Sequence, residues 1–160
     1  KPIQILVNNA GFFYDVVPLI EMSDAQVSKT IDINLKGTMY MSREVCRRIV
    51  DAGLPGRVVN ISSGAGHSGR VNFSNYCASK AGVLGLTRAM ALELAPKHIN
   101  VNSVSAFWSA SAATGSPAAI SRSTAANPAA VSPSRIEHQA PARPGPVFAR
   151  YLLNRKEVAI

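Results

Sequence analysis

The chain has 160 residues, of which 47% are hydrophobic, 6% aromatic and 16% charged, with a formal net charge of +8. This length is enough for one domain with a buried core. No apolar run approaches the roughly 18 residues needed to span a bilayer, and we expect no membrane contact. The basic residues are scattered and aromatic residues are few, so the sequence does not predict a nucleic-acid surface, which needs basic clusters with interleaved aromatics.

The first predicted element is a buried strand at residues 3–8. Its nearly continuous apolar run is typical of a parallel strand with both faces covered. An Asn-Asn-Ala-Gly turn follows at residues 8–11. The chain begins at Lys1 without an initiator methionine and enters this strand at once, so we expect an amino-terminal βαβ portion to be missing. The strand would then have an open edge, which favours aggregation or marginal folding of the chain alone.

A long helix is predicted from about Asp24 to Val50. Ser23, followed three residues later by Gln26, has the pattern of a capping box, in which each side chain accepts a backbone hydrogen bond at the start of a helix. Gly53 is expected to end this helix in a left-handed conformation.

Two more strands and a second helix follow in the chain. The first of these strands is a β-branched run at residues 57–61, and a Gly-rich loop follows it at residues 62–73. The helix is predicted by the apolar spacing of residues 74–94, and the second strand is a short apolar run at residues 99–104. Strands that alternate with helices in this way predict a parallel sheet covered by helices. Ligands bind such sheets at the carboxyl ends of the strands.

Composition changes abruptly after Ser105. Between residues 106 and 150 more than half of the side chains are Ala, Ser or Pro, and Glu137 is the only acid, which predicts a loop or disordered tail. A shifted reading frame at the end of the gene is one hypothesis for this composition. Residues 151–160 are expected to form a short amphipathic helix.

Tyr76 and Lys80 lie four residues apart in the predicted helix 74–94. One helical turn places them on the same face, where the lysine charge favours a phenolate over a phenol. Such a tyrosine can give a proton to a reacting oxygen or take one from it. Taken alone, either residue is more often a solvated helix side chain.

Four motifs in register closely resemble the short-chain dehydrogenase/reductase family, from about Pro2 to Val104. They are the Asn-Asn-Ala-Gly turn, the asparagine of Asn-Leu-Lys-Gly, the serine that ends the next strand, and the tyrosine–lysine pair: residues 8–11, Asn34, Ser63, Tyr76 and Lys80. The stretch looks most like 3-oxoacyl-carrier-protein reductases. The resemblance implies an α/β fold with a Rossmann-type doubly wound parallel sheet, of which residues 1–105 would be the catalytic half and the carboxyl-terminal part would be atypical.

The resemblance also implies an NAD(P)-dependent oxidoreductase that interconverts a secondary alcohol and a ketone. Tyr76 would be the general acid and base, and Lys80 would support it and bind the nicotinamide ribose. Ser63 would hold the substrate oxygen; the family places this serine 13 residues before the tyrosine, which selects Ser63 over Ser62. The backbone of Asn34, at an irregularity in its helix, would hold a water that relays protons to Lys80.

The expected cofactor is NAD or NADP, with NADP slightly preferred. Residues of the turn and of the tyrosine–lysine pair are implied to contact it: Asn8, Ala10, Gly11, Tyr76 and Lys80. Residues 8–11 would also support the central sheet. The Gly-rich turn that binds the cofactor phosphates has no counterpart between residues 1 and 11.

Three aromatic residues after the turn, Phe12, Phe13 and Tyr14, could border the mouth of the substrate site or pack on their own fold. The expected substrate is a small carbonyl or alcohol. An alternative to an enzyme is an inactive truncated member that keeps only the surface of its two long helices, through which full-length relatives form homodimers or homotetramers.

No metal site is expected. Cys46 and Cys77 lack the spacing of metal ligands, and neither His67 nor His98 has a partner at metal or triad spacing. With no signal-peptide pattern at the start of the chain, the cysteine usage predicts a reduced, cytoplasmic protein.

Overall fold

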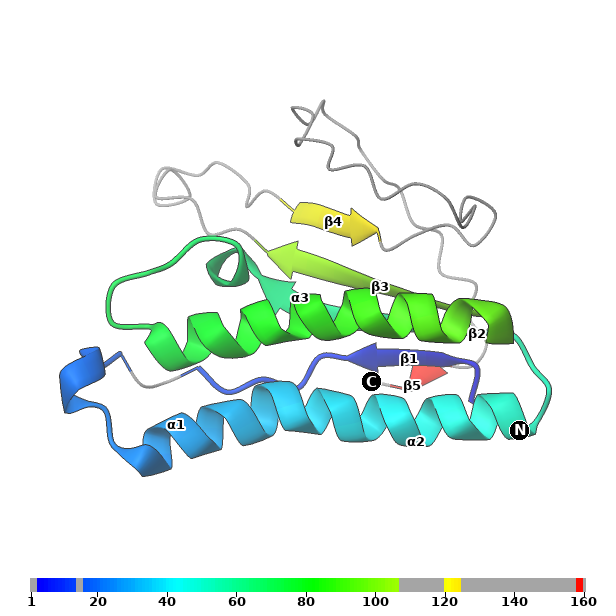
Figure 1. Cartoon of the computed structure of the whole chain (residues 1–160), viewed down its shortest axis with the longest axis horizontal. Coiled ribbons are helices and arrows are strands. Elements are labelled where there is room, and N and C mark those ends of the chain that lie inside the picture. Colours follow the sequence, from blue (N-terminus) through cyan, green and yellow to red (C-terminus); the bar gives the residue numbers. More distant parts are fainter. Residues whose placement is uncertain (1–2, 14–15, 107–119, 125–157, 160) are drawn as a thin grey trace.

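The computed structural model describes residues 3–13, 16–106, 120–124 and 158–159. Its centre is one five-stranded sheet in the order β4-β3-β2-β1-β5 (Figure 1). The strands are β1 (Ile5–Asn8), β2 (Gly56–Ser63), β3 (Ile99–Ala106), β4 (Ile120–Thr124) and β5 (Val158–Ala159). All neighbours in the sheet are parallel except β4, which runs antiparallel to β3. The predicted parallel sheet of three strands is confirmed.

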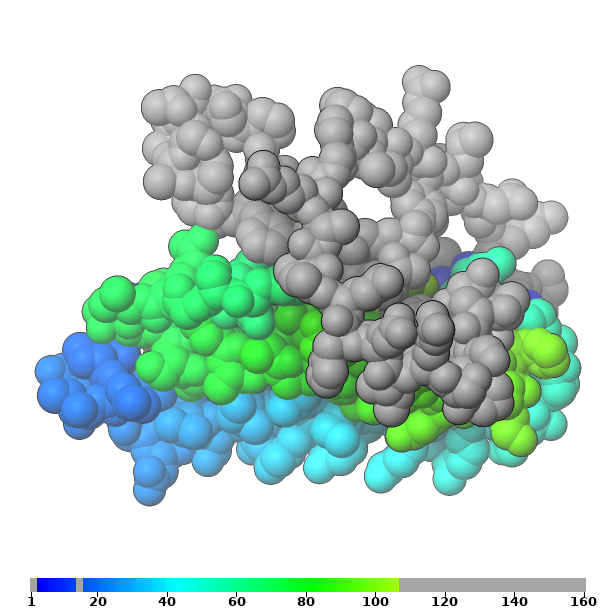
Figure 2. Space-filling view, turned by 45° about the horizontal axis from the view of Figure 1, so that its top comes forward, coloured from blue at the N-terminus to red at the C-terminus, as the bar shows by residue number. Residues whose placement is uncertain are grey.

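Two long helical segments lie on one face of this sheet (Figure 1), and the space-filling view shows them side by side (Figure 2). The first segment is α1 (Asp24–Ile31), the π-helical η2 (Asp32–Lys36) and α2 (Gly37–Asp51), and the second is α3 (Ser74–Leu94). Three 3-10 turns complete the described helices: η1 (Leu19–Glu21), η3 (Gly64–Gly66) and η4 (Ala95–Lys97). Among the helices that the structure describes, none has the length and hydropathy to cross a membrane.

The ends of the first helical segment follow from local capping. The Ser23 hydroxyl accepts from the Gln26 amide at 3.4 Å, and the Gln26 side chain accepts from the Ser23 amide at 2.9 Å. At the other end Gly53 adopts a φ of 64°, a conformation that glycine reaches without strain. Both predicted caps are confirmed. The predicted helix, however, is interrupted by the five-residue π-helical turn η2, which contains Asn34.

The buried face of the sheet changes from apolar to polar along the strands. Leu6, Val58 and Val101 lie in one row across the three parallel strands and belong to the core under α2 and α3. The next row towards the carboxyl ends is polar, and it contains Asn8 and Asn60, both buried. A buried polar row needs internal hydrogen bonds.

Hydrogen bonds between side chains satisfy Asn8 and Asn60 and join the two helices through the sheet. The Ser103 hydroxyl, buried in the same row, has no hydrogen-bond partner among the described residues. The Asn8 amide group donates to Ser42 on α2 and to the Asn60 carbonyl oxygen, both at 2.8 Å. The Asn60 amide group donates in turn to the Thr87 hydroxyl on α3 at 2.9 Å. Asn60 therefore bridges β1 and α3 and is fully buried.

Replacing Asn60 by alanine is expected to lower the free energy of unfolding by about 3 kcal/mol, because two buried hydrogen bonds are lost and their partners are left partly unpaired. Urea unfolding followed by circular dichroism measures this. Asn100, which is exposed on β3, provides the matched control, and Asn100→Ala should change stability by no more than about 0.5 kcal/mol. Equal losses in the two variants would contradict the bridging role.

Cys46 lies in the core, 4% exposed, and burial raises the pKa of its thiol to about 11. Between about pH 9 and pH 11 the folded chain therefore keeps the thiol proton while the unfolded chain loses it. Over this window the thiol lowers the free energy of unfolding as pH rises, and below it the thiol has no effect on stability. At pH 8 we expect a thiol reagent to label the half-buried Cys77 first and Cys46 only on unfolding. Mass spectrometry of the labelled peptides measures both rates, and equal rates in the native chain would contradict this.

The structure differs from the sequence prediction at both edges of the sheet. β4 lies within the segment predicted as a loop, and β5 lies where a short helix was predicted. Both strands use the free backbone groups of an edge: β4 pairs along β3, and Val158 and Ala159 pair with Ile5 and Leu6 of β1. The edge of β1 that was predicted to be open is thus covered at these two residues. The remaining parts of the predicted tail lie outside the described residues.

Candidate active site

The predicted site residues gather at the carboxyl ends of β1 and β2 and the first turns of α3. Ser63 is the last residue of β2, while Tyr76 and Lys80 lie in the first two turns of α3. Gly11 follows β1, and a Cβ atom on it would lie 3.6 Å from the Lys80 ammonium nitrogen and 3.7 Å from Asn34 Oδ1. The topology therefore brings the turn, the lysine and the asparagine together.

Lys80 is buried, with only 4% of its surface exposed. Its ammonium group donates to the Ile61 carbonyl at 2.8 Å and lies 5.7 Å from the centre of the Tyr76 ring. Burial lowers the pKa of Lys80, because a charged group loses its hydration there. An ammonium group has three donors, so two remain for a ligand or for water beside Tyr76.

The two serines at the end of β2 have different surroundings. Ser62 is buried, and its hydroxyl donates to the Lys80 carbonyl at 3.0 Å, which fixes the strand to the helix. Ser63 is half-buried at the start of η3, and its oxygen accepts from the Ala65 amide at 3.2 Å. The hydroxyl of Ser62 is thus used within the fold, and this supports Ser63 as the serine that meets a substrate.

Asn34 holds three groups with one side chain. Its carbonyl oxygen accepts from the Phe12 amide at 2.6 Å, and its amide group donates to the Phe12 carbonyl and to the Ser79 hydroxyl, both at 3.0 Å. Ser79 in turn donates to the Tyr76 carbonyl at 2.8 Å. The irregular helix expected at Asn34 is present as the π-helical turn η2. The backbone of Asn34 was expected to hold a water molecule. Here the Asn34 main-chain carbonyl accepts a hydrogen bond from the Thr38 hydroxyl at 2.8 Å.

The turn after β1 was predicted both to support the sheet and to contact the cofactor, and its residues differ in which of these roles they suit. The Asn8 side chain is buried in the hydrogen-bond network of the sheet, whereas Ala10 and Gly11 are exposed. Ala10 and Gly11 thus offer surface to a ligand, and so does the exposed Asn9, whereas the Asn8 side chain does not. Contact of Asn8, Ala10 and Gly11 with a cofactor stays a prediction.

An aromatic cluster borders Tyr76. The Phe13 ring stacks on Phe73 with 5.2 Å between ring centres and meets the Tyr76 ring edge to face at 4.6 Å. The backbone of Val17 donates to the Asn72 carbonyl at 3.1 Å, which joins the two loops that carry these rings. Tyr14 lies outside the described residues.

Sequence reasoning missed three positioning residues. Ser79 links Asn34 to Tyr76, and His67, interpreted as incidental, lies 3.0 Å from the Ser105 hydroxyl at the end of β3. Gly66 packs directly on α3, where a Cβ atom would come within 2.8 Å of the Lys80 carbonyl carbon. A glycine three residues after the predicted active serine was the available signal for this close approach.

Comparison with known proteins identifies the family of the chain. The family model described as short chain dehydrogenase matches residues 1–116. Over 102 residues the chain is 43% identical to the 3-oxoacyl-(acyl-carrier-protein) reductase FabG of Rickettsia conorii (strain ATCC VR-613 / Malish 7), covering 64% of this chain and 42% of that protein. It is 38% identical over 102 residues to the sorbitol dehydrogenase of Cereibacter sphaeroides, covering 64% and 40%.

A solved structure described as 4-hydroxyisoleucine dehydrogenase complexed with NADH and succinate aligns with a TM-score of 0.61 and 38% identity, covering 62% of this chain and 47% of that one. The chain spans less than half the length of the curated relatives it matches. The family match over residues 1–116 covers well over half of the chain. The chain therefore belongs to the short-chain dehydrogenase/reductase family.

Proposed function

We propose that this chain carries the catalytic half of an NAD(P)-dependent oxidoreductase that interconverts a secondary alcohol and a ketone. The observation that carries the proposal is the buried Lys80 ammonium group, held at the end of β2 beside the Tyr76 ring. In a family whose relatives include reductases and dehydrogenases, this pairing suits proton transfer at a reacting oxygen. Residues 1–105 would form this half, and the stretch 106–150 and the end of the chain would lie outside it.

In the reduction, the Tyr76 hydroxyl gives its proton to the substrate oxygen, and the resulting phenolate is stabilised by the Lys80 charge. The Ser63 hydroxyl donates a hydrogen bond to the same oxygen and stabilises the negative charge that develops there. Lys80 returns a proton to Tyr76 through water. Asn34 holds the loop after β1 in place through the backbone of Phe12. In the oxidation, each proton moves in the opposite direction. A bound nicotinamide supplies or accepts the hydride.

The residues present fit the nicotinamide end of such a cofactor. Gly11 is small and exposed, close to both Lys80 and Asn34, and the lysine keeps donors for ribose hydroxyls. The relative described with NADH supports a nicotinamide cofactor. Between the two forms we propose NADP as slightly preferred. We also propose a 3-oxoacyl thioester as the substrate class, from the resemblance to the 3-oxoacyl reductases.

Titration of the chain with NADH and with NADPH, followed by nicotinamide fluorescence, tests the proposal. We expect saturable binding that is weakened at least about tenfold in Lys80→Ala, which removes a charged hydrogen-bond donor. The exposed Lys97 on η4 gives the matched control, since Lys97→Ala should leave the affinity unchanged. An absence of binding, or equal effects of the two substitutions, would contradict the assignment of Lys80.

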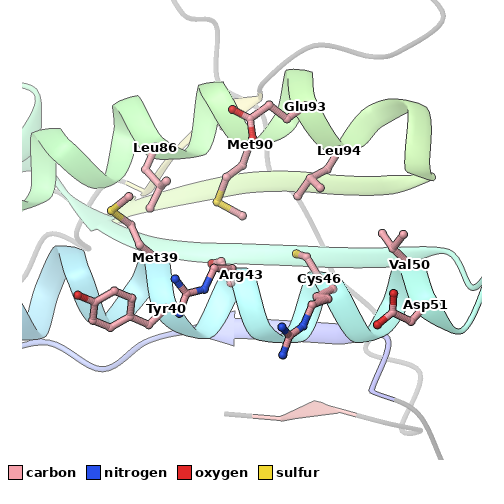
Figure 3. A pocket seen from close by; sticks show the side chains of 12 residues that line it. Met39, Tyr40, Arg43, Cys46, Val50, Asp51, Leu86, Met90, Glu93 and Leu94 are labelled. Carbon is pink, nitrogen blue, oxygen red and sulfur yellow. The ribbon is translucent and has the colours of Figure 1, made fainter.

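A second candidate is an inactive member that keeps an association surface. A groove of about 450 Å³ lies between α2 and α3, away from Tyr76 and Ser63, and the side chains that line it include Met39, Tyr40, Leu86, Met90 and Leu94 (Figure 3). Its rim includes exposed apolar groups, with Met39 45% and Tyr40 56% exposed. Such a surface suits a homodimer or homotetramer.

Sedimentation velocity over a concentration range tests this candidate. Association that Met39→Glu abolishes, combined with no binding of either nicotinamide cofactor, would favour the second candidate. A concentration-independent monomer would contradict the association surface.

Both cysteines are free thiols in the structure, which supports a reducing, cytoplasmic compartment for either candidate.

A further inference from the structure

The aromatic side chains beside Tyr76 point to the kind of group that the substrate carries, an inference that rests on the proposed function. Phe13 stacks on Phe73 at 5.2 Å with only 13° between the ring planes, so the two nearly parallel rings form an offset stack with an aromatic surface. The same Phe13 ring meets Tyr76 at 4.6 Å. The surface thus begins at the ring that carries the proposed acid.

This surface is open although it is apolar. Phe13 is 49% exposed, and Phe73 is half-buried. Large apolar side chains usually bury more of their surface than this. An exposed aromatic face next to a catalytic group is therefore a suitable contact for an apolar part of a ligand.

The position of Phe13 is fixed by groups outside the aromatic cluster. Asn34 binds both the amide and the carbonyl of Phe12, at 2.6 and 3.0 Å, so the backbone that leads into Phe13 is tied to η2. On the other side, the Val17–Asn72 backbone hydrogen bond of 3.1 Å ties the end of this loop to the loop of Phe73. A contact surface held at both ends binds with little loss of conformational entropy.

We propose that Phe13 and Phe73 form the substrate-side wall of the site and select, among carbonyl compounds such as the 3-oxoacyl thioesters proposed above, those that carry a flat, apolar group on the carbonyl carbon. With its oxygen at the Tyr76 hydroxyl, such a substrate places this group against the Phe13 ring, which lies one ring contact away. Aromatic contacts of this kind favour aryl over small alkyl groups. Phe13 is thus a specificity-determining residue.

Binding of two ketones to the 160-residue chain tests the wall without requiring hydride transfer. The probes are 1-phenylethanone, which carries a flat ring, and 2-butanone, which carries an ethyl group, and saturation-transfer NMR measures their affinities. We expect Phe13→Ala to weaken 1-phenylethanone about fivefold and 2-butanone less than about twofold. Phe13→Tyr should restore the preference. Val71→Ala, on the neighbouring loop, should change neither affinity.

Phe73→Ala gives a second variant with the same expected direction should Phe13→Ala unfold. Equal weakening of both ketones would mean that Phe13 only supports Tyr76, and it would overturn the proposal, as would no saturable binding of 1-phenylethanone. A different result would contradict the proposed function alone: the aryl ketone binds in a Phe13-dependent manner, but neither nicotinamide cofactor binds.

Discussion

Replacing Tyr76 by phenylalanine is expected to lower the reductase rate at least about a hundredfold, the usual scale for a positioned general acid. The test uses a chimera in which the 102-residue stretch of this chain replaces the matching stretch of the Rickettsia conorii reductase, since the chain covers 42% of that protein. The phenyl ring keeps its contact with Phe13, so the fold and the affinity for NADPH should change little.

Stopped-flow oxidation of NADPH gives the rate, and fluorescence titration gives the affinity. Tyr40, which is exposed on α2, is the matched control, and Tyr40→Phe should keep full activity. A Tyr76→Phe chimera that keeps more than about a third of the rate would show that another group transfers the proton. Loss of NADPH binding in the same variant would point to a structural effect instead.

Replacing Gly66 by alanine is expected to cost about 2 to 3 kcal/mol of stability, the scale of overpacking in a close contact. The new Cβ atom would lie 2.8 to 2.9 Å from backbone atoms of Lys80 and Ala81, which cannot move without shifting α3. Because η3 begins directly after Ser63, the serine should shift relative to Tyr76. A misplacement near 1 Å can lower a rate by about a hundredfold.

Urea unfolding measures the stability change, and kcat in the chimera measures the shift of the site. Gly69 lies in the same loop, and a Cβ atom on it meets nothing within 4 Å. Gly69→Ala should therefore leave both quantities close to those of the parent. Equal behaviour of the two glycine variants would contradict the tight packing of η3 on α3.

The elements with local signals could be predicted from the sequence. The helix α3 begins at Ser74 and ends at Leu94, just before Pro96, as predicted, and the first helical segment begins at its capping box. Caps and helix breakers act through neighbouring residues, so their effect is visible in the sequence. The order of strands and helices then determined the parallel sheet and the edge at which the site lies.

The elements that depend on distant residues could not be predicted. Neither β4 nor β5 has a strong strand pattern of its own, and each forms against the free edge of another strand. The contact between Phe13 and Tyr76 and the packing of Gly66 on Lys80 likewise join residues that are far apart or in different elements. The irregularity at Asn34 was expected only from the family resemblance, because the hydrogen-bond partners of its side chain, Phe12 and Ser79, lie outside the helix.

The most direct test of the account is whether this chain's site residues catalyse hydride transfer. The measurement is NADPH oxidation by the chimera with a 3-oxoacyl thioester. We expect kcat within about tenfold of the parent reductase, because the proposed mechanism assigns its steps to Ser63, Tyr76, Lys80 and Asn34, and the chimera keeps all four. A chimera that folds and binds NADPH yet shows no oxidation above background would contradict the proposed catalytic role of this site.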